Sequence, residues 1–212
     1  MFKMTFAASA ALLISTIGAQ AALVDFTDSS AFNNHDTSET VAGVTFTLTS
    51  MPVGPNFDDT LNTTATSYCG GHPLACDNDG AGVVDDEVTN PAEFLMVSAS
   101  EAVRITKVYV FDLFSGAASA ESVEIDAMGD GSIEFSASAS AADVNGFGMF
   151  SVGGVPAADI FKFTAGPGND DSGRPDYALA GFEFEVAPVP VPAGMVLLSG
   201  ALAGLGFARR RS

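Results

Sequence analysis

The chain has 212 residues, of which 47% are hydrophobic, and it contains 26 acidic residues against eight basic ones. A chain of this length supports one domain with a substantial hydrophobic core. A strong excess of negative charge repels nucleic acid and anionic lipid headgroups, so the composition excludes both as partners.

The N-terminus has the pattern of a secretory signal peptide. An early lysine precedes an apolar centre at residues 6–17, and Ala19 and Ala21 form a small-x-small cleavage site. The apolar centre is too short to serve as a retained membrane anchor. We therefore expect residues 1–21 to be removed during export and a single domain of residues 22–187 to follow.

The exported domain would keep four basic residues and all the acidic ones. Two interpretations of this charge remain open. The acidic side chains can maintain solubility in a saline habitat, where salt screens their mutual repulsion. Alternatively, some of the carboxylates hold calcium.

Residues 22–187 show strand patterns throughout. Residues 44–48 alternate apolar and polar side chains, which is typical of a half-buried strand. The apolar positions of residues 103–111 do not keep one parity, which predicts a bulge or burial on both faces. The remaining predicted strands are residues 22–26, 94–97, 123–127, 133–135, 149–152, 160–164 and 177–186.

These strands are separated by short turns, and no segment has the period of an amphipathic helix. The clearest hairpin joins residues 123–127 to residues 133–135 through the glycines of residues 129–131. The pattern predicts an all-β domain, folded as an antiparallel β-sandwich that is jelly-roll-like.

Residues 51–90 are the least regular region, and we expect a loop there rather than a strand pair. Cys69 and Cys76 are the only cysteines. In an oxidising exported compartment, a close pair of cysteines forms a structural disulfide. A redox site would favour a Cys-x-x-Cys motif, and a zinc site would need more ligands than the two cysteines and His72.

An acidic cluster follows the second cysteine. Calcium takes six to eight oxygen ligands, and an acidic loop closed by a disulfide can gather them. The spacing is not that of an EF-hand, because with Gly80 at the turn the first ligand position falls on Ala75. The alternative is a set of solvated surface charges. Calcium is the one candidate cofactor, and its candidate ligands are Asp77, Asp79, Asp85, Asp86 and Glu87.

The C-terminus combines three features in order: a motif with two prolines, an uncharged apolar span at residues 192–208, and a basic end. The span is just long enough to cross a bilayer, and its arginines should stay on the cytoplasmic side. A buried globular helix would show a polar face, which this span lacks. The motif consists of Val189, Pro190, Val191, Pro192 and Ala193, and the basic end consists of Arg209, Arg210 and Arg211.

In this order, the three features resemble the sorting tails of the PEP-CTERM family of exported bacterial proteins, in the branch whose motif reads Val-Pro-Leu-Pro-Ala. Val191 stands where that branch usually has leucine. The resemblance covers residues 188–212. It implies processing by an exosortase-type membrane transpeptidase, a transient anchor in the inner membrane, and transfer to the cell surface or an exopolysaccharide matrix.

Three classes of function compete. The first, which we favour, is a non-catalytic cell-surface or extracellular-matrix protein that is sorted through its tail. The second is a calcium-dependent glycan-binding module, although the chain has no tryptophan and only three tyrosines to stack on sugars. The third is a glycoside hydrolase, which would need two facing carboxylates. Neither His35 nor His72 lies in a nucleophile motif, so we predict that the protein is not an enzyme.

Overall fold

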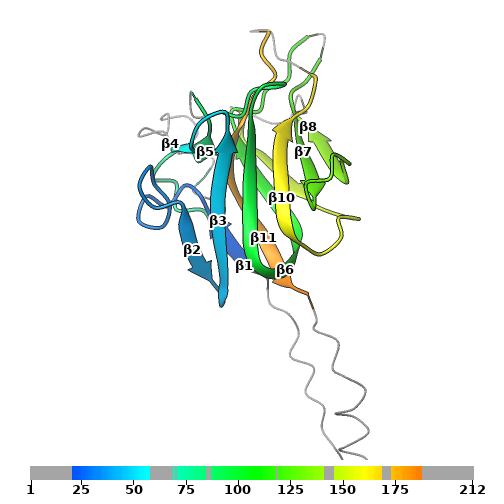
Figure 1. The fold of residues 1–212 in the computed structure, drawn as a ribbon. Helices are drawn as coiled ribbons and strands as arrows, with labels where there is room; N and C mark the ends of the chain where they lie inside the picture. The colour runs from blue at the N-terminus through cyan, green and yellow to red at the C-terminus, as the bar shows by residue number, and fades with distance from the viewer. Residues whose placement is uncertain are drawn as a thin grey trace, which may run out of the picture.

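The computed structural model describes residues 21–57, 69, 71–84, 87–117, 119–140, 146–168 and 173–187. All named elements of these residues are β-strands, and every strand pairing is antiparallel. The all-β prediction is therefore confirmed (Figure 1). The strands are β1 (Ala22–Asp25), β2 (Ser38–Val41), β3 (Val44–Met51), β4 (Asn56–Phe57), β5 (Ala81–Gly82), β6 (Phe94–Phe111), β7 (Ser122–Ala127), β8 (Phe135–Ser138), β9 (Gly148–Ser151), β10 (Ala158–Ala165) and β11 (Ala178–Val186).

Strand β6 organises the sheet, because it pairs with four other strands. Its first half pairs with β3 and β10, and its second half pairs with β11 and β9. The sequence predicted two separate strands here, at residues 94–97 and 103–111, and that division is wrong. Ser98 and Ala99 continue the pairing with β3, and Val103 pairs with Ala158 of β10, so the strand continues through its small polar middle.

The main core takes its buried side chains from β1, β3, β6, β7, β10 and β11, among other segments. The ring of Phe46 on β3 lies 5.6 Å from that of Phe182 and 4.7 Å from that of Phe184, both on β11. The ring of Phe163 on β10 lies 6.1 Å from that of Phe182. Aromatic pairs at such distances add to the gain from burying their area. Phenylalanines from strands far apart in the sequence therefore meet in one core.

Both expected causes of the irregular parity in residues 103–111 are present, namely a bulge and burial on both faces of the strand. The register between β6 and β11 shifts at Thr106, which has no partner residue on β11. Because of this bulge, Ile105 and Val108 both face the main core, although an unbroken strand would place an odd-numbered and an even-numbered residue on opposite faces. Tyr109 and Phe111 are buried on the opposite face, in a second and smaller hydrophobic cluster.

Two local predictions are wrong. β4 and β5 form a strand pair within residues 51–90, where we expected none, because two-residue strands leave no periodic pattern in a sequence. The return strand of the hairpin begins at Phe135 rather than at residue 133. The carboxylate of Asp126 accepts hydrogen bonds from the backbone N–H groups of Asp130 and Gly131, at 3.1 and 2.8 Å, so a side chain closes this turn, and Ile133 beyond it is 46% exposed.

Candidate functional site

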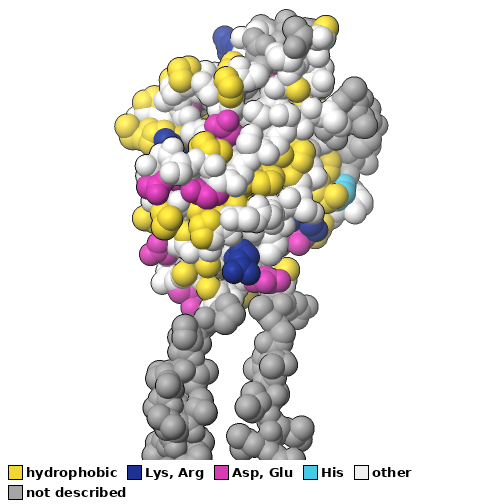
Figure 2. All heavy atoms as spheres, turned by 90° about the vertical axis from the view of Figure 1, so that its right-hand side faces the viewer, with side chains coloured by type: hydrophobic (Ala, Val, Ile, Leu, Met, Phe, Trp, Pro, Cys, Tyr) yellow, Lys and Arg dark blue, Asp and Glu magenta, His cyan; other side chains and the backbone are white. Residues whose placement is uncertain are grey.

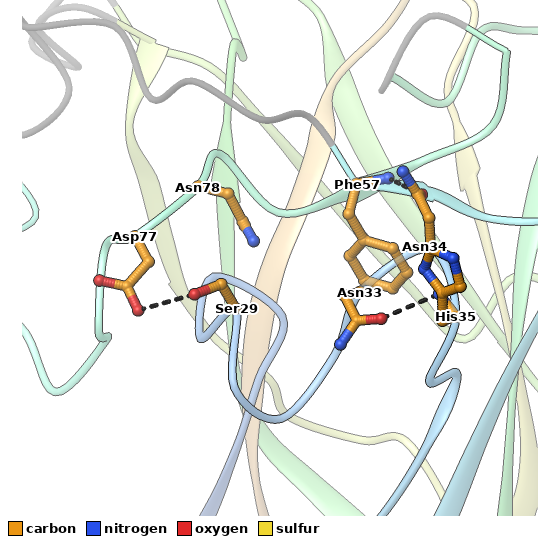
Figure 3. Close-up of a pocket in the computed structure, with 7 residues that line it drawn as sticks. All are labelled: Ser29, Asn33, Asn34, His35, Phe57, Asp77 and Asn78. Atoms are coloured by element: carbon orange, nitrogen blue, oxygen red, sulfur yellow. Dashed lines mark hydrogen bonds between the residues drawn. The ribbon is translucent and has the colours of Figure 1, made fainter.

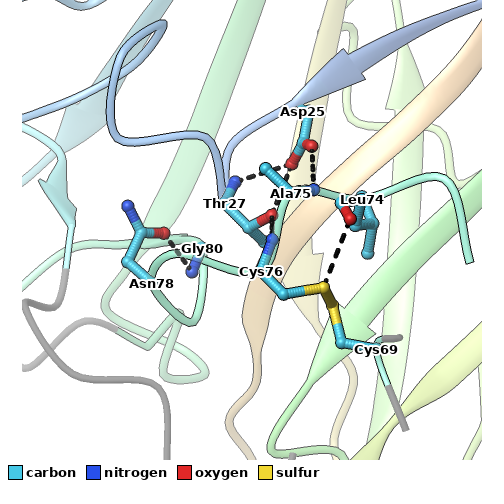
Figure 4. Close-up of a disulfide and its surroundings, with 8 residues drawn as sticks. All are labelled: Asp25, Thr27, Cys69, Leu74, Ala75, Cys76, Asn78 and Gly80. Carbon is cyan, nitrogen blue, oxygen red and sulfur yellow. Dashed lines mark hydrogen bonds between the residues drawn. A yellow bond between two sulfur atoms is a disulfide. The ribbon is translucent and has the colours of Figure 1, made fainter. Parts of the chain in front are cut away.

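The predicted disulfide between Cys69 and Cys76 is present, with the two Cα atoms 6.1 Å apart. Cys69 is fully buried in the second cluster, which also contains Leu74 and Tyr109. A side chain at Gly181 of β11 would come within 2.5 Å of the Val24 carbonyl oxygen on β1 and within 3.3 Å of Leu74, so glycine there lets both β1 and the loop approach β11. The disulfide is thus a structural link that fixes the loop on the outer face of β6 and β11 (Figure 4).

Hydrogen bonds to the end of β1 hold the same loop. The Asp25 carboxylate accepts from the backbone N–H of Ala75 at 2.6 Å and from the Thr27 hydroxyl at 2.6 Å. The Thr27 hydroxyl oxygen in turn accepts from the backbone N–H of Cys76 at 2.9 Å, and the Thr27 carbonyl accepts from that of Asp77 at 3.0 Å. This connection spans about fifty residues of sequence, and no sequence pattern indicated it.

The structure tests the proposed calcium ligands only in part, because Asp85 and Asp86 lie outside the described residues. Asp77 is exposed and accepts a hydrogen bond from the Ser29 hydroxyl at 3.2 Å, whereas Asp79 is only 7% exposed. Among the residues that the structure describes, Glu87 included, no group of three or more acidic, histidine or cysteine side chains could hold a metal ion. The calcium site stays a prediction. Figure 2 shows acidic side chains spread over one face of the molecule.

A cavity of about 370 Å³ lies beside the loop. Its walls come from the turn after β1, from β4, and from the residues that follow Cys76 (Figure 3). Among its lining residues, the sequence analysis singled out Asp77 as a ligand and considered His35 only as a catalytic candidate. The other lining residues belong to no sequence pattern that indicates a site, because the three segments that carry them come together only when the chain folds. The lining residues are Ser29, Asn33, Asn34, His35, Phe57, Asp77 and Asn78.

The three asparagines of this cavity are each fixed through their side-chain oxygen. The Oδ1 atom of Asn33 accepts from the backbone N–H groups of His35 and Asp36, at 2.9 and 3.0 Å. The Oδ1 atom of Asn34 accepts from the Phe57 N–H at 3.0 Å, and that of Asn78 accepts from the Gly80 N–H at 3.0 Å. An amide that uses its oxygen in this way leaves its Nδ2 group as a hydrogen-bond donor.

Phe57 gives the cavity an apolar wall. This residue is 4% exposed, and its ring stacks on Phe32 with a centroid distance of 6.4 Å. Phe32 in turn packs edge-to-face on Phe26 at 4.8 Å, and both are fully buried. The wall is therefore continuous with the main hydrophobic core, which limits its freedom to move.

On β11, Glu183 accepts hydrogen bonds from Lys107 Nζ at 2.9 Å and from the Tyr109 hydroxyl at 2.6 Å. Burial alone would raise the pKa of Glu183, but the hydrogen bonds from Tyr109 and Lys107 hold that pKa below its ordinary value. The His72 ring lies beside this group, 4.6 Å from the ring of Phe147. His72 thus packs on an aromatic ring next to an ion pair, which fits a structural role.

A second cavity, of about 150 Å³, contains two carboxylates, those of Glu93 and Glu124. Glu93 accepts a hydrogen bond from the Thr89 N–H at 3.0 Å. Nearby, the hydroxyl of Tyr177 is buried without a hydrogen-bond partner among the described residues, and burial together with the charge of Glu124 raises its pKa. No aromatic ring is among the described residues that line this cavity; the others are Asn90, Pro91, Thr164 and Ala165.

Most of the predicted targeting residues lie outside the described part of the chain. These include Ala19, the motif at residues 189–193, the span at residues 192–208 and the arginines at residues 209–211. Within the described residues, no helix is long and apolar enough to cross a membrane. No family model, no curated protein and no solved structure matches this chain.

Proposed function

We propose that this chain is a non-catalytic exported protein of the cell surface or extracellular matrix, delivered through its C-terminal tail. The carrying observation is the order of motif, apolar span and arginines in residues 188–212, together with a signal-peptide pattern in residues 1–21. An exosortase-type enzyme would process the tail, and an exopolysaccharide is the candidate matrix partner. The domain of residues 22–187 would then be the part that acts outside the cell.

We also propose that this domain is a β-sandwich. The support is the exchange of partners along β6, which pairs with β3 and β10 in one half and with β11 and β9 in the other. The ring contacts of Phe46 and Phe163 with Phe182 are those expected between two facing layers. The jelly-roll connection of the strands stays a prediction.

A glycoside hydrolase is a weaker alternative. Such enzymes place a sugar between two carboxylates, and the cavity with Glu93 and Glu124 supplies two. Sugar-cleaving clefts also present rings on which the substrate stacks, and the described lining residues of this cavity supply none. We therefore retain the non-catalytic interpretation.

The sorting proposal is tested by replacing the basic end. The triple variant Arg209→Ser, Arg210→Ser, Arg211→Ser removes the charges that should keep the tail in the cytoplasm, so the protein should be released or misoriented. Surface display is measured by labelling intact cells. The matched control is Arg174→Ser, which removes a positive charge from the domain and should leave display unchanged. Full surface display of the triple variant would contradict the proposal.

A calcium-dependent glycan-binding module is the other alternative, and a melting experiment tests it. A site that binds only the folded state adds about 2.7 kcal/mol at a hundredfold excess of ligand over the dissociation constant. We expect calcium to raise the melting temperature no more than magnesium does. A larger rise that disappears when Asp77, Asp79, Asp85 and Asp86 are replaced by asparagine would instead establish the calcium site.

A further inference from the structure

We propose that the cavity lined by Asn33, Asn34, Phe57, Asp77 and Asn78 binds a neutral sugar unit without a metal ion. This inference does not depend on the sorting tail. It goes beyond the calcium-dependent alternative, because it assigns the binding to amide nitrogens, which cannot hold a cation, although both ideas use the Asp77 carboxylate.

The first argument is the set of hydrogen-bond donors. Because backbone N–H groups occupy the Oδ1 atoms of Asn33, Asn34 and Asn78, all three amides keep their Nδ2 groups as donors. Within the described part of the chain, no group accepts a hydrogen bond from these nitrogens. Figure 3 shows the nitrogen of Asn78 pointing toward the turn that carries Ser29 and Asn33. Three fixed donors around one cavity suit a ligand rich in oxygen.

The second argument is the acceptor beside them. One oxygen of the Asp77 carboxylate accepts from the Ser29 hydroxyl, and the carboxylate has room for further donors. A sugar hydroxyl both donates and accepts, so neighbouring hydroxyls can bind an amide and a carboxylate at once. No lysine or arginine is among the described residues that line the cavity, which disfavours phosphate and sulfate groups. Among the same described residues, three amides and one carboxylate line the cavity, and an excess of donors over carboxylates also disfavours a cation.

The third argument is shape and rigidity. A volume of about 370 Å³ falls within the ordinary size range of small-ligand sites. Phe57 supplies an apolar wall against which the C–H groups of a sugar can pack. The disulfide and the hydrogen bonds that Asp25 and Thr27 accept from the loop hold one side of the cavity in place before any ligand arrives. A preformed site loses less conformational freedom on binding.

The test uses the full chain, purified in detergent, with EDTA present. The probes are neutral oligosaccharides of glucose, galactose, mannose and N-acetylglucosamine, with dextran sulfate and polygalacturonate as anionic counterparts. Binding is measured by titration calorimetry. We expect at least one neutral probe to bind in EDTA, and to bind more tightly than either anionic polymer.

Two variants with matched controls locate the site. Asn34→Asp keeps the acceptor for the Phe57 N–H but loses the amide donor, and it should weaken binding about tenfold. Asn56→Asp adds the same charge nearby, at a residue outside the lining, and should have no effect. Ser29→Leu fills the cavity and should abolish binding, whereas Ser30→Leu places the same bulk on the exposed neighbouring residue.

Ser29 and Asn34 are both exposed, so melting curves should show these variants folded. Three results would overturn the proposal: no binding of any neutral probe, binding that EDTA abolishes, or binding that survives both cavity variants. The measurement is made on purified protein, so its outcome is separate from that of the surface-display experiment.

Discussion

The two hydrophobic clusters of this domain are built in different ways. The main core is held by many side chains from long paired strands, and Phe46, Phe163 and Phe182 lie at its centre. The second cluster is small, and one disulfide with a few hydrogen bonds from loop N–H groups to Asp25 and Thr27 keeps its covering loop in place. The first therefore has redundant support, whereas the second depends on a small number of specific bonds.

The largest expected effect is in the main core. Phe182→Ala removes a fully buried ring that contacts four other phenylalanines, and it should lower the free energy of unfolding by about 3–5 kcal/mol. Denaturant titration measures the change. The control is Phe114→Ala, at a residue that is 38% exposed, and it should change stability far less. Equal losses from both variants would contradict the assignment of Phe182 to the core.

An intermediate effect is expected from the disulfide. Replacing Cys69 and Cys76 together by alanine opens a loop with a sequence separation of 7, which corresponds to about 2.5 kcal/mol in the chain-entropy model. The loss should appear as a lower melting temperature that reducing agent does not lower further. Limited proteolysis should then cut the loop before the sheet. If the sheet is cut equally early, the two clusters are not independent.

The smallest of the three effects is expected at the carboxylate that anchors the loop. Asp25→Asn replaces one of the two accepting carboxylate oxygens with an NH2 group, which is a donor. The free energy of unfolding should fall by about 1.5 kcal/mol. Hydrogen exchange should speed up at Ala75 and Cys76 and stay unchanged in the main core. Asp159→Asn, on an exposed residue of β10, is the matched control. Uniform loss of protection across the whole sheet would contradict a local role for Asp25.

The difference between a core of long paired strands and a loop held by a few specific bonds also explains which parts of the structure could be predicted. Side chains of residues 44–48 alternate because one face of β3 is buried, and such a period is visible in any sequence. The bulge at Thr106 was indicated by the broken parity of residues 103–111. A disulfide between the only two cysteines needed no further pattern.

The cavity could not be predicted in the same way. Its asparagines take their roles from one or two backbone N–H groups each, such as the bond from Phe57 to Asn34 across 23 residues. Asparagines in polar segments look like ordinary turn residues. The continuity of β6 was missed for a related reason. The residues in its middle are small and polar and have little intrinsic preference for a strand, so their extended conformation comes from pairing with neighbouring strands.

The position of β11 has a mechanical consequence. β11 is the last strand that the structure describes, so tension applied from its C-terminal side would enter at Val186. β11 pairs with β6 from Ala178 to Val186 on one side and with β1 from residues 181 to 184 on the other (Figure 1). A force along the strand therefore acts in shear on the hydrogen bonds to both neighbouring strands. These hydrogen bonds bear the force together instead of breaking one after another. A domain tethered through this strand is suited to withstand flow.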